Sequence, residues 1–269
     1  MPKLVIWGNC QTAGVWEVFR KLPAFAKDWE VRHHELWASG EKLASDLADL
    51  DNCDVLLVQD LRNWNSDPRR AALSPATRII RFPFCYFAAL WPFDGHQNGP
   101  DPGWHYGEGN LQFGFQDHLL GRLRQQEPEP ERRLVVYQTL AVEDVPDIAR
   151  YAAFEEARLL RDDSRLDFGI GRYIVDHYCT ERLFHAITHP TPLLLARLVR
   201  ELLDRLGLDD AGVDECTLDF FGYFQVPLHP LVIERLRITW ADTDTRYNFQ
   251  NREALTFEAY VRRYIQVYG

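Results

Sequence analysis

Short strand patterns and helical patterns alternate along the first third of the chain. Strand patterns occur at residues 4–7, 31–36, 55–58 and 78–82. Between them, apolar residues recur at helical spacing at about residues 12–22, 40–50 and 67–73. This alternation predicts a mostly parallel sheet flanked by helices, an α/β fold. The run at residues 55–58 is apolar throughout, as expected for a strand that is covered on both faces.

The pattern changes after residue 82. Residues 94–103 are rich in Gly, Pro, Asp and Asn and predict a long loop, either a binding loop or lid or a plain surface excursion. The charged, proline-containing stretch at residues 125–133 predicts a solvated loop or hinge. Helical periodicity returns at about residues 111–124, 145–160, 168–178, 193–206 and 256–267. We therefore predict a single α/β domain over residues 1–269, with a loop-rich insertion at about 82–110 and a mainly helical part at about 111–269.

Composition narrows the class of protein. A net charge of −10 argues against a general nucleic-acid binder, because phosphate neutralisation needs a basic surface. The sequence holds no apolar stretch long enough to span a membrane and starts without a signal-peptide pattern, so we expect a cytoplasmic protein. Its five cysteines are scattered and lack CxxC spacing, which argues against a disulfide framework and a zinc site.

Cys10 stands at a place that suits chemistry. The segment Gly8-Asn9-Cys10-Gln11 lies where the first predicted strand turns into a helix. Open α/β sheets bind ligands outside the carboxyl ends of their strands. A helix N-terminus also offers free N–H groups and positive potential, which favour a thiolate. Cys10 is therefore a candidate nucleophile; the alternative is a small buried core residue.

A nucleophilic cysteine needs a base and a group that stabilises an oxyanion. His189 is the first candidate base because it sits before a strong helix start, Thr191-Pro192, and His185 is the second. Either histidine could instead be structural. Backbone N–H groups after Cys10, with the amide of Asn9 or Gln59, are candidate oxyanion donors. The alternatives are helix capping for Asn9 and a satisfied buried amide for Gln59.

Other chemistries fit less well. His185, His189 and His229 are the candidate metal ligands, but the first two precede a helix and no acidic residue has the required spacing, so we predict no metal. His33 and His34 point to opposite faces of a strand and make a poor metal pair. The N-terminal glycines lack both GxGxxG and the GK[ST] of a P-loop. Trp7, Trp91 and Trp104 could line a pocket, although aromatic residues belong more often to the core.

Two families share parts of this pattern. Gly8-Asn9-Cys10 resembles the Gly-Asp-Ser block of SGNH/GDSL hydrolases, and Thr188-His189-Pro190 resembles their C-terminal Asp-x-x-His block. Cys10 replaces the serine, and Ala186 stands where those hydrolases have the aspartate. This resemblance implies an SGNH/Rossmann-like three-layer core, and any acid that orients the base must come from elsewhere.

The second resemblance spans nearly the whole chain. The chain is similar to the WcbI family of capsular polysaccharide biosynthesis proteins, which are proposed acetyltransferases that bind coenzyme A. The shared segments, in order, are Gly8-Asn-Cys-Gln11, Cys53-Asp-Val-Leu-Leu-Val-Gln59, Arg81-Phe-Pro83, Leu183-Phe-His-Ala-Ile-Thr-His-Pro-Thr191, Pro227-Leu-His-Pro230 and Leu255-Thr-Phe-Glu-Ala-Tyr260. Each segment is short, so the specificity lies in the ordered set.

The WcbI resemblance implies a function. It implies transfer of an acetyl group from acetyl-coenzyme A to a sugar hydroxyl of a polysaccharide precursor, with both small molecules as partners. Cys10 with His189 or His185 would carry catalysis. The residues implied to contact the coenzyme are Gly8, Asn9, Gln11, Gln59, Thr188 and His229. The alternatives are an SGNH-like esterase or thioesterase and a non-catalytic protein that binds coenzyme A or a sugar. Nothing in the sequence predicts an oligomeric state.

Overall fold

The computed structural model describes residues 1–36, 39–61, 67–94, 113 and 117–268. Contacts group the chain into two compact units. The first comprises Met1–Tyr86, Glu156–Asp176 and His189–Phe220. The second comprises Phe87–Glu155, His177–Thr188 and Phe221–Gly269. Almost all of the predicted loop at residues 94–103 lies outside the described residues.

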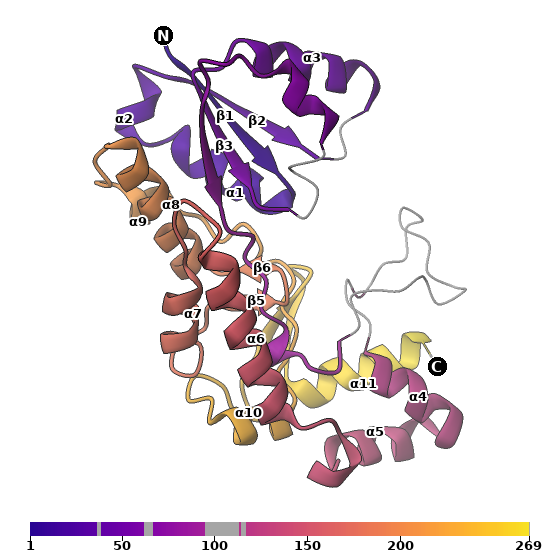
Figure 1. Cartoon of the computed structure of the whole chain (residues 1–269). Helices are drawn as coiled ribbons and strands as arrows, with labels where there is room; N and C mark the ends of the chain where they lie inside the picture. Colours follow the sequence, from indigo (N-terminus) through magenta and orange to yellow (C-terminus); the bar gives the residue numbers. More distant parts are fainter. Residues whose placement is uncertain (37–38, 62–66, 95–112, 114–116, 269) are drawn as a thin grey trace. The chain divides into compact units, whose positions relative to one another are not determined.

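A four-stranded parallel sheet forms the centre of the first unit (Figure 1). Its strands are β1 (Lys3–Gly8), β2 (Glu30–Glu35), β3 (Val55–Gln59) and β4 (Arg78–Phe82), in the order β2-β1-β3-β4. All four predicted strands are confirmed to within two residues at each end. The predicted α/β fold with a parallel sheet is therefore confirmed.

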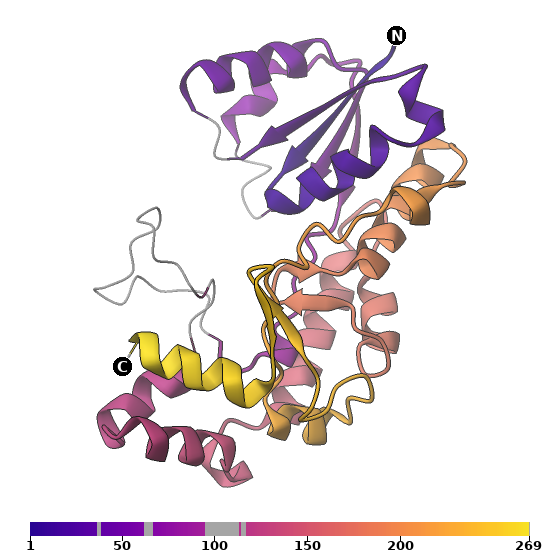
Figure 2. The same ribbon diagram turned by 180° about the vertical axis from the view of Figure 1, so that it is seen from behind.

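Helices cover both faces of this sheet, as Figures 1 and 2 show. Helix α3 (Gly40–Asp51) and the 3₁₀ helix η2 (Pro68–Ala72) pack on the face that carries Val5, Trp7 and Val58. Helix α1 (Cys10–Phe19) contacts β1 and β2. Because side chains alternate along a strand, His33 reaches α1 while His34 reaches α3, on opposite faces as the sequence predicts.

The remaining elements of the first unit are mainly helical. They are α2 (Pro23–Ala26), β6 (His189–Pro190), α8 (Pro192–Leu206), α9 (Val213–Cys216), the last half of α6 (Ile148–Asp163) and most of α7 (Gly171–His177). Helix α8 begins after Thr191 with Pro192 in its first turn, and it ends at Gly207 with a φ of 72°, as the sequence predicts. Helices α8 and α9 pack against α1.

The second unit is built from helices and a β-hairpin. It contains η3 (Ala88–Leu90), α4 (His118–Gln126), α5 (Pro130–Gln138), η4 (Val142–Asp144), the first half of α6, β5 (Phe184–Ala186), α10 (Pro230–Leu236), the antiparallel strands β7 (Tyr247–Phe249) and β8 (Glu253–Leu255), and α11 (Phe257–Tyr268). Helix α5 packs against both α4 and α11. Among the described residues, no helix is long and apolar enough to cross a membrane.

One expectation about this unit is wrong. Most of the predicted loop at residues 125–133 is helical, because α4 runs to Gln126 and α5 already begins at Pro130. Proline suits the first turn of a helix, where its missing N–H costs nothing. The carboxylate of Glu129 accepts hydrogen bonds from the backbone N–H groups of Glu131 and Arg132 and so caps the new helix. Only residues 127–129 separate the two helices.

Candidate active site

Cys10 lies at the carboxyl edge of the sheet, as predicted. Strand β1 ends at Gly8, and Cys10 is the first residue of α1. From β1 the chain leads to β2 on one side of the sheet and then to β3 on the other. Ligands of open α/β sheets bind at such a change of direction, outside the carboxyl ends of the strands. The topology thus places Cys10 at the preferred ligand site of the first unit.

Asn9 shapes the start of α1. Its side-chain oxygen accepts a hydrogen bond from the Gln11 N–H at 3.0 Å, so it is the helix N-cap. Its carbonyl oxygen accepts the hydroxyl proton of Thr12 at 2.6 Å. The Thr12 oxygen must therefore accept from Nε2–H of His33 at 2.8 Å. Burial lowers the pKa of His33 to about 4, so this histidine is neutral at pH 7.

Two buried glutamines tie the site together. The side chain of Gln59 donates to Gln11 Oε1 at 2.9 Å and accepts from the Asn9 N–H at 3.0 Å. The Gln11 side chain also donates to the Cys85 carbonyl at 2.8 Å and accepts from the Cys85 N–H at 3.0 Å. Each glutamine is 1% exposed. Both side-chain amides are hydrogen-bonded within the protein, which favours a positioning role for these glutamines. Direct contact of either glutamine with a coenzyme stays a prediction.

Opposing influences act on the pKa of the Cys10 thiol. The backbone N–H groups of Cys10 and Gln11, at the start of the helix, lower the pKa of this thiol. Burial and the nearby carboxylate of Glu35 raise it, and together they outweigh the amides. The net pKa lies above its ordinary value, so the expectation of a thiolate-favouring site is wrong, although the backbone N–H groups at the helix start act in the expected direction. A reaction at this sulfur needs a base.

Replacing Glu35 by glutamine is expected to make Cys10 more reactive. The substitution removes a negative charge that raises the thiol pKa, so the thiolate fraction at pH 7 increases. Alkylation by iodoacetamide, followed as a function of pH by peptide mass spectrometry, should shift to lower pH at Cys10. The matched control is Glu30→Gln at the start of the same strand, which should leave the Cys10 profile unchanged. An unchanged profile in Glu35→Gln would contradict this account.

The histidines singled out by sequence fall in different units. His189 begins β6 and belongs to the same unit as Cys10, whereas His185 lies buried in β5 of the second unit. Thr188 is half-buried and also belongs to the second unit. A Cys10–His189 pair therefore stays a prediction, and membership of one unit makes His189 the better candidate of the two.

His229 has a structural role in the second unit. Its Nδ1 accepts from the Leu231 N–H at 3.1 Å and caps α10, while its Nε2–H donates to the Tyr137 carbonyl at 2.9 Å. Burial lowers its pKa, so the ring is neutral. Both ring nitrogens are used within the protein. Among the described residues, no three His, Cys, Asp or Glu side chains gather as a metal site would require.

Comparison with known proteins places this geometry in a family. Residues 3–211 match the family described as polysaccharide biosynthesis enzyme WcbI. The chain belongs to the WcbI family. A solved WcbI structure, described as that of a novel polysaccharide biosynthesis enzyme, has a TM-score of 0.75 and 17% sequence identity, and the match covers 99% of this chain and 89% of that one. That structure is of the native protein without a disulfide bond between coenzyme A and one of its cysteines. No curated protein matches the chain.

Sequence reasoning missed two neighbours of Cys10 in this WcbI-family fold. Glu35 pairs in register with Gly8 across the sheet, and His33 reaches Thr12 from the same strand. Alternation along β2 places both side chains on the face that α1 covers. The strand pattern at residues 31–36 was the available signal, but its register with β1 decides which residues reach the site.

Proposed function

We propose that this chain transfers an acetyl group from acetyl-coenzyme A to a sugar hydroxyl in polysaccharide biosynthesis. Membership of the WcbI family supports the pathway. The observation that carries the chemistry is Cys10 at the change of strand direction, as the first residue of α1. The related WcbI structure is described in terms of coenzyme A and a cysteine, and we take Cys10 as the corresponding residue here.

In the covalent version, a base removes the proton of the Cys10 thiol. The thiolate attacks the thioester carbonyl carbon, the coenzyme leaves as a thiol after gaining a proton, and the acetyl group stays on Sγ. His189 is the proposed base. It would then accept the proton of the sugar hydroxyl as that oxygen attacks the acetyl-enzyme, restoring the free thiol. The positive potential at the start of α1 favours the negative charge on the carbonyl oxygen.

In the direct version, His189 activates the sugar hydroxyl, which attacks acetyl-coenzyme A itself. Cys10 then only lines the site. Transfer to water instead of a sugar would make the protein an esterase or thioesterase. A rate that rises when sugar acceptors are added distinguishes transfer from hydrolysis.

Cys10→Ala is expected to abolish the acetyl-enzyme. Intact-mass measurement after mixing with acetyl-coenzyme A should show one acetyl group on the parent chain and none on the variant. Steady-state transfer should fall by about a hundredfold or more, because the nucleophile is lost. The matched control is Cys216→Ala, which removes a half-buried cysteine of α9 and should retain both signals.

Each version predicts a different result. Unchanged transfer by Cys10→Ala would exclude the covalent version and leave the direct one, which His189→Ala should then inactivate. A further alternative is a non-catalytic protein that binds coenzyme A or a sugar. Equal binding of coenzyme A by the parent, Cys10→Ala and His189→Ala, with no turnover by any of them, would establish that alternative and overturn our proposal.

A further inference from the structure

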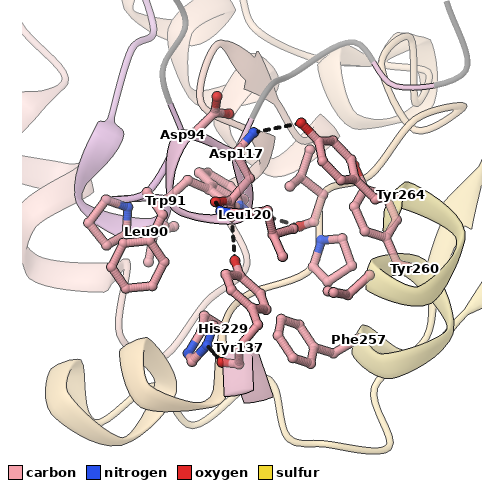
Figure 3. A pocket seen from close by; sticks show the side chains of 15 residues that line it. Leu90, Trp91, Asp94, Asp117, Leu120, Tyr137, His229, Phe257, Tyr260 and Tyr264 are labelled. Carbon is pink, nitrogen blue, oxygen red and sulfur yellow. Dashed lines mark hydrogen bonds between the residues drawn. The ribbon is translucent and has the colours of Figure 1, made fainter. Parts of the chain in front are cut away.

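The second unit contains a cavity that is lined by aromatic side chains and two carboxyl groups. It has a volume of about 50 Å³, room for about three or four water-sized groups. Most of its wall is apolar or aromatic, from residues that include Trp91, Phe93, Phe257, Tyr260 and Tyr264. Two carboxyl groups, those of Asp94 and Asp117, also line it (Figure 3). None of the described lining residues is a lysine or an arginine.

The carboxylate of Asp117 has hydrogen-bond donors inside this cavity. Its carboxylate accepts the Tyr137 hydroxyl and the Leu120 N–H, and it caps α4. Its own N–H donates to the Tyr264 hydroxyl oxygen at 3.1 Å, so the Tyr264 proton remains available to another acceptor. Figure 3 shows Tyr137 and Tyr264 approaching Asp117 from different directions. The Asp117 carboxylate therefore has donors from Tyr137 and Leu120, and the Asp117 N–H has Tyr264 as its acceptor.

Asp94 is not compensated in this way. Its Oδ1 atom is buried, and no hydrogen bond reaches it from the described residues. Asp94 as a whole is half-buried, but a negative charge on a buried oxygen atom that accepts no hydrogen bond is costly, so this carboxyl group favours uptake of a proton or a cation. Burial and the charge of Asp117 raise the pKa of Asp94 to about 8, whereas the pKa of Asp117 is raised to about 6. At pH 7 the Asp94 carboxyl group is therefore mostly protonated.

We propose that this cavity binds the ammonium group of a small organic amine, which donates a hydrogen bond to Asp94 and lies among the surrounding aromatic rings. An ammonium supplies the positive charge and the N–H donor that the Asp94 carboxylate lacks. Aromatic rings attract cations, and they are the main walls here. A metal ion fits less well, because no three ligating side chains gather among the described residues. This inference does not depend on the proposed acetyl transfer.

Binding of the ammonium group changes the protonation state of Asp94. The Asp94 carboxyl group releases its proton to the buffer, and the resulting carboxylate pairs with the ammonium. The other titratable or charged groups around the two carboxyls are Arg122 from α4, Tyr137 from α5, His229 at the start of α10, and Tyr260, Tyr264 and Tyr268 from α11. Burial raises the pKa values of Tyr137, Tyr260 and Tyr264, so these tyrosines stay neutral. Asp94 is then the group that sets the pH dependence between pH 6 and 9.

Isothermal titration of the full chain with n-butylammonium chloride tests this site. With a pKa of about 8 for Asp94, the affinity should fall about 30-fold from pH 9 to pH 6.5. Near pH 7, buffers of different ionisation enthalpy should report release of close to one proton per amine bound. Asp94→Asn should weaken binding at pH 9 by about tenfold or more and remove the pH dependence. Asparagine has the shape of the neutral carboxyl group, so the variant is expected to fold.

Three comparison ligands make the test decisive. Butan-1-ol has the same chain without charge, and tetramethylammonium has the charge without an N–H donor, so both should bind more weakly than butylammonium. Equal binding of butan-1-ol would overturn the proposal, as would binding of a neutral methyl pyranoside in preference to the amine. Absence of proton release by the parent chain would overturn it without reference to any variant. Wild-type affinity in Asp94→Asn would show that the ammonium binds elsewhere.

Discussion

Gly8→Ala is expected to lower the free energy of unfolding by about 1–3 kcal/mol, and by more if the sheet edge cannot shift. A Cβ atom at Gly8 would lie 2.6 Å from Gln59 Oε1, 2.6 Å from Thr12 Cγ2 and 2.7 Å from Gln59 Cβ. The Cβ of Gln59 is fixed to its strand and cannot swing away. Relief of the clash must move β1 from β3 and lengthen the bond from the Asn9 N–H to Gln59, so Cys10 should also react faster with iodoacetamide.

Gly121→Ala is the matched control for this substitution. Gly121 lies inside α4, and outside the backbone of its own helix and its two chain neighbours no atom stands within 4 Å of the added Cβ. Alanine favours the helix there, so the variant should be stabilised by about 0.5–1 kcal/mol. Urea unfolding followed by circular dichroism measures both variants. If Gly8→Ala proves as stable as the parent, the close packing of β1 against Gln59 is not what requires glycine at this position.

The sheet could be predicted from sequence because each strand carries its own signal. The segment at residues 55–58 is apolar on both faces, and the observed β3 is fully buried. Helix α5 was not predicted, because the residues around its start are charged and resemble a solvated loop. Pro130 and the capping carboxylate of Glu129 define that start, and both also occur in loops. Local patterns were therefore sufficient for the apolar strands, but they did not identify a helix whose start is charged.

The candidate site also has a part that could be predicted from sequence and a part that could not. The position of Cys10 depends on neighbours within a few residues, so the strand-to-helix pattern was sufficient. The bonds that fix Gln11 come from Gln59 and Cys85, which are 48 and 74 residues away in the chain. The thiol pKa depends on how burial and Glu35 balance two backbone N–H groups. The position of Cys10 at a helix start predicts only that the backbone N–H groups lower the thiol pKa. It does not predict that burial and Glu35 raise it.

The two carboxyl groups of the cavity had no sequence signal. Asp94 comes from the segment after η3, Asp117 precedes α4, and the tyrosines beside them belong to α5 and α11. These elements are brought together only by the packing of α11 and α4 on α5. Of the aromatic residues considered from sequence, Trp91 lines this cavity and Trp7 is buried in the sheet core. Trp104 lies outside the described residues.

Asp94→Asn is expected to stabilise the second unit at pH 8, by an amount on the order of 3–5 kcal/mol. The pKa of Asp94 is raised from 3.8 to about 8 in the folded chain, so folding is favoured while this carboxyl group is protonated. That stabilisation is fully present below pH 3.8 and is lost as the pH rises through about 8. Asparagine stays neutral throughout, and the variant should therefore retain at pH 8 the stability that the parent loses.

Urea unfolding at a series of pH values from 4 to 8 measures this difference, and hydrogen exchange of α4 and α11 assigns it to the second unit. The variant and the parent should be equally stable near pH 4 and should diverge as the pH rises. Asp117 is present in both proteins. Because its pKa is raised to about 6 in the folded chain, its ionisation lowers the free energy of unfolding of both proteins as the pH rises. Glu143→Gln, which neutralises an exposed carboxylate of the same unit, should follow the parent at every pH. A pH-independent difference between Asp94→Asn and the parent would mean that Asp94 is already ionised in the folded chain, and the cavity would then have no proton to exchange for a cation.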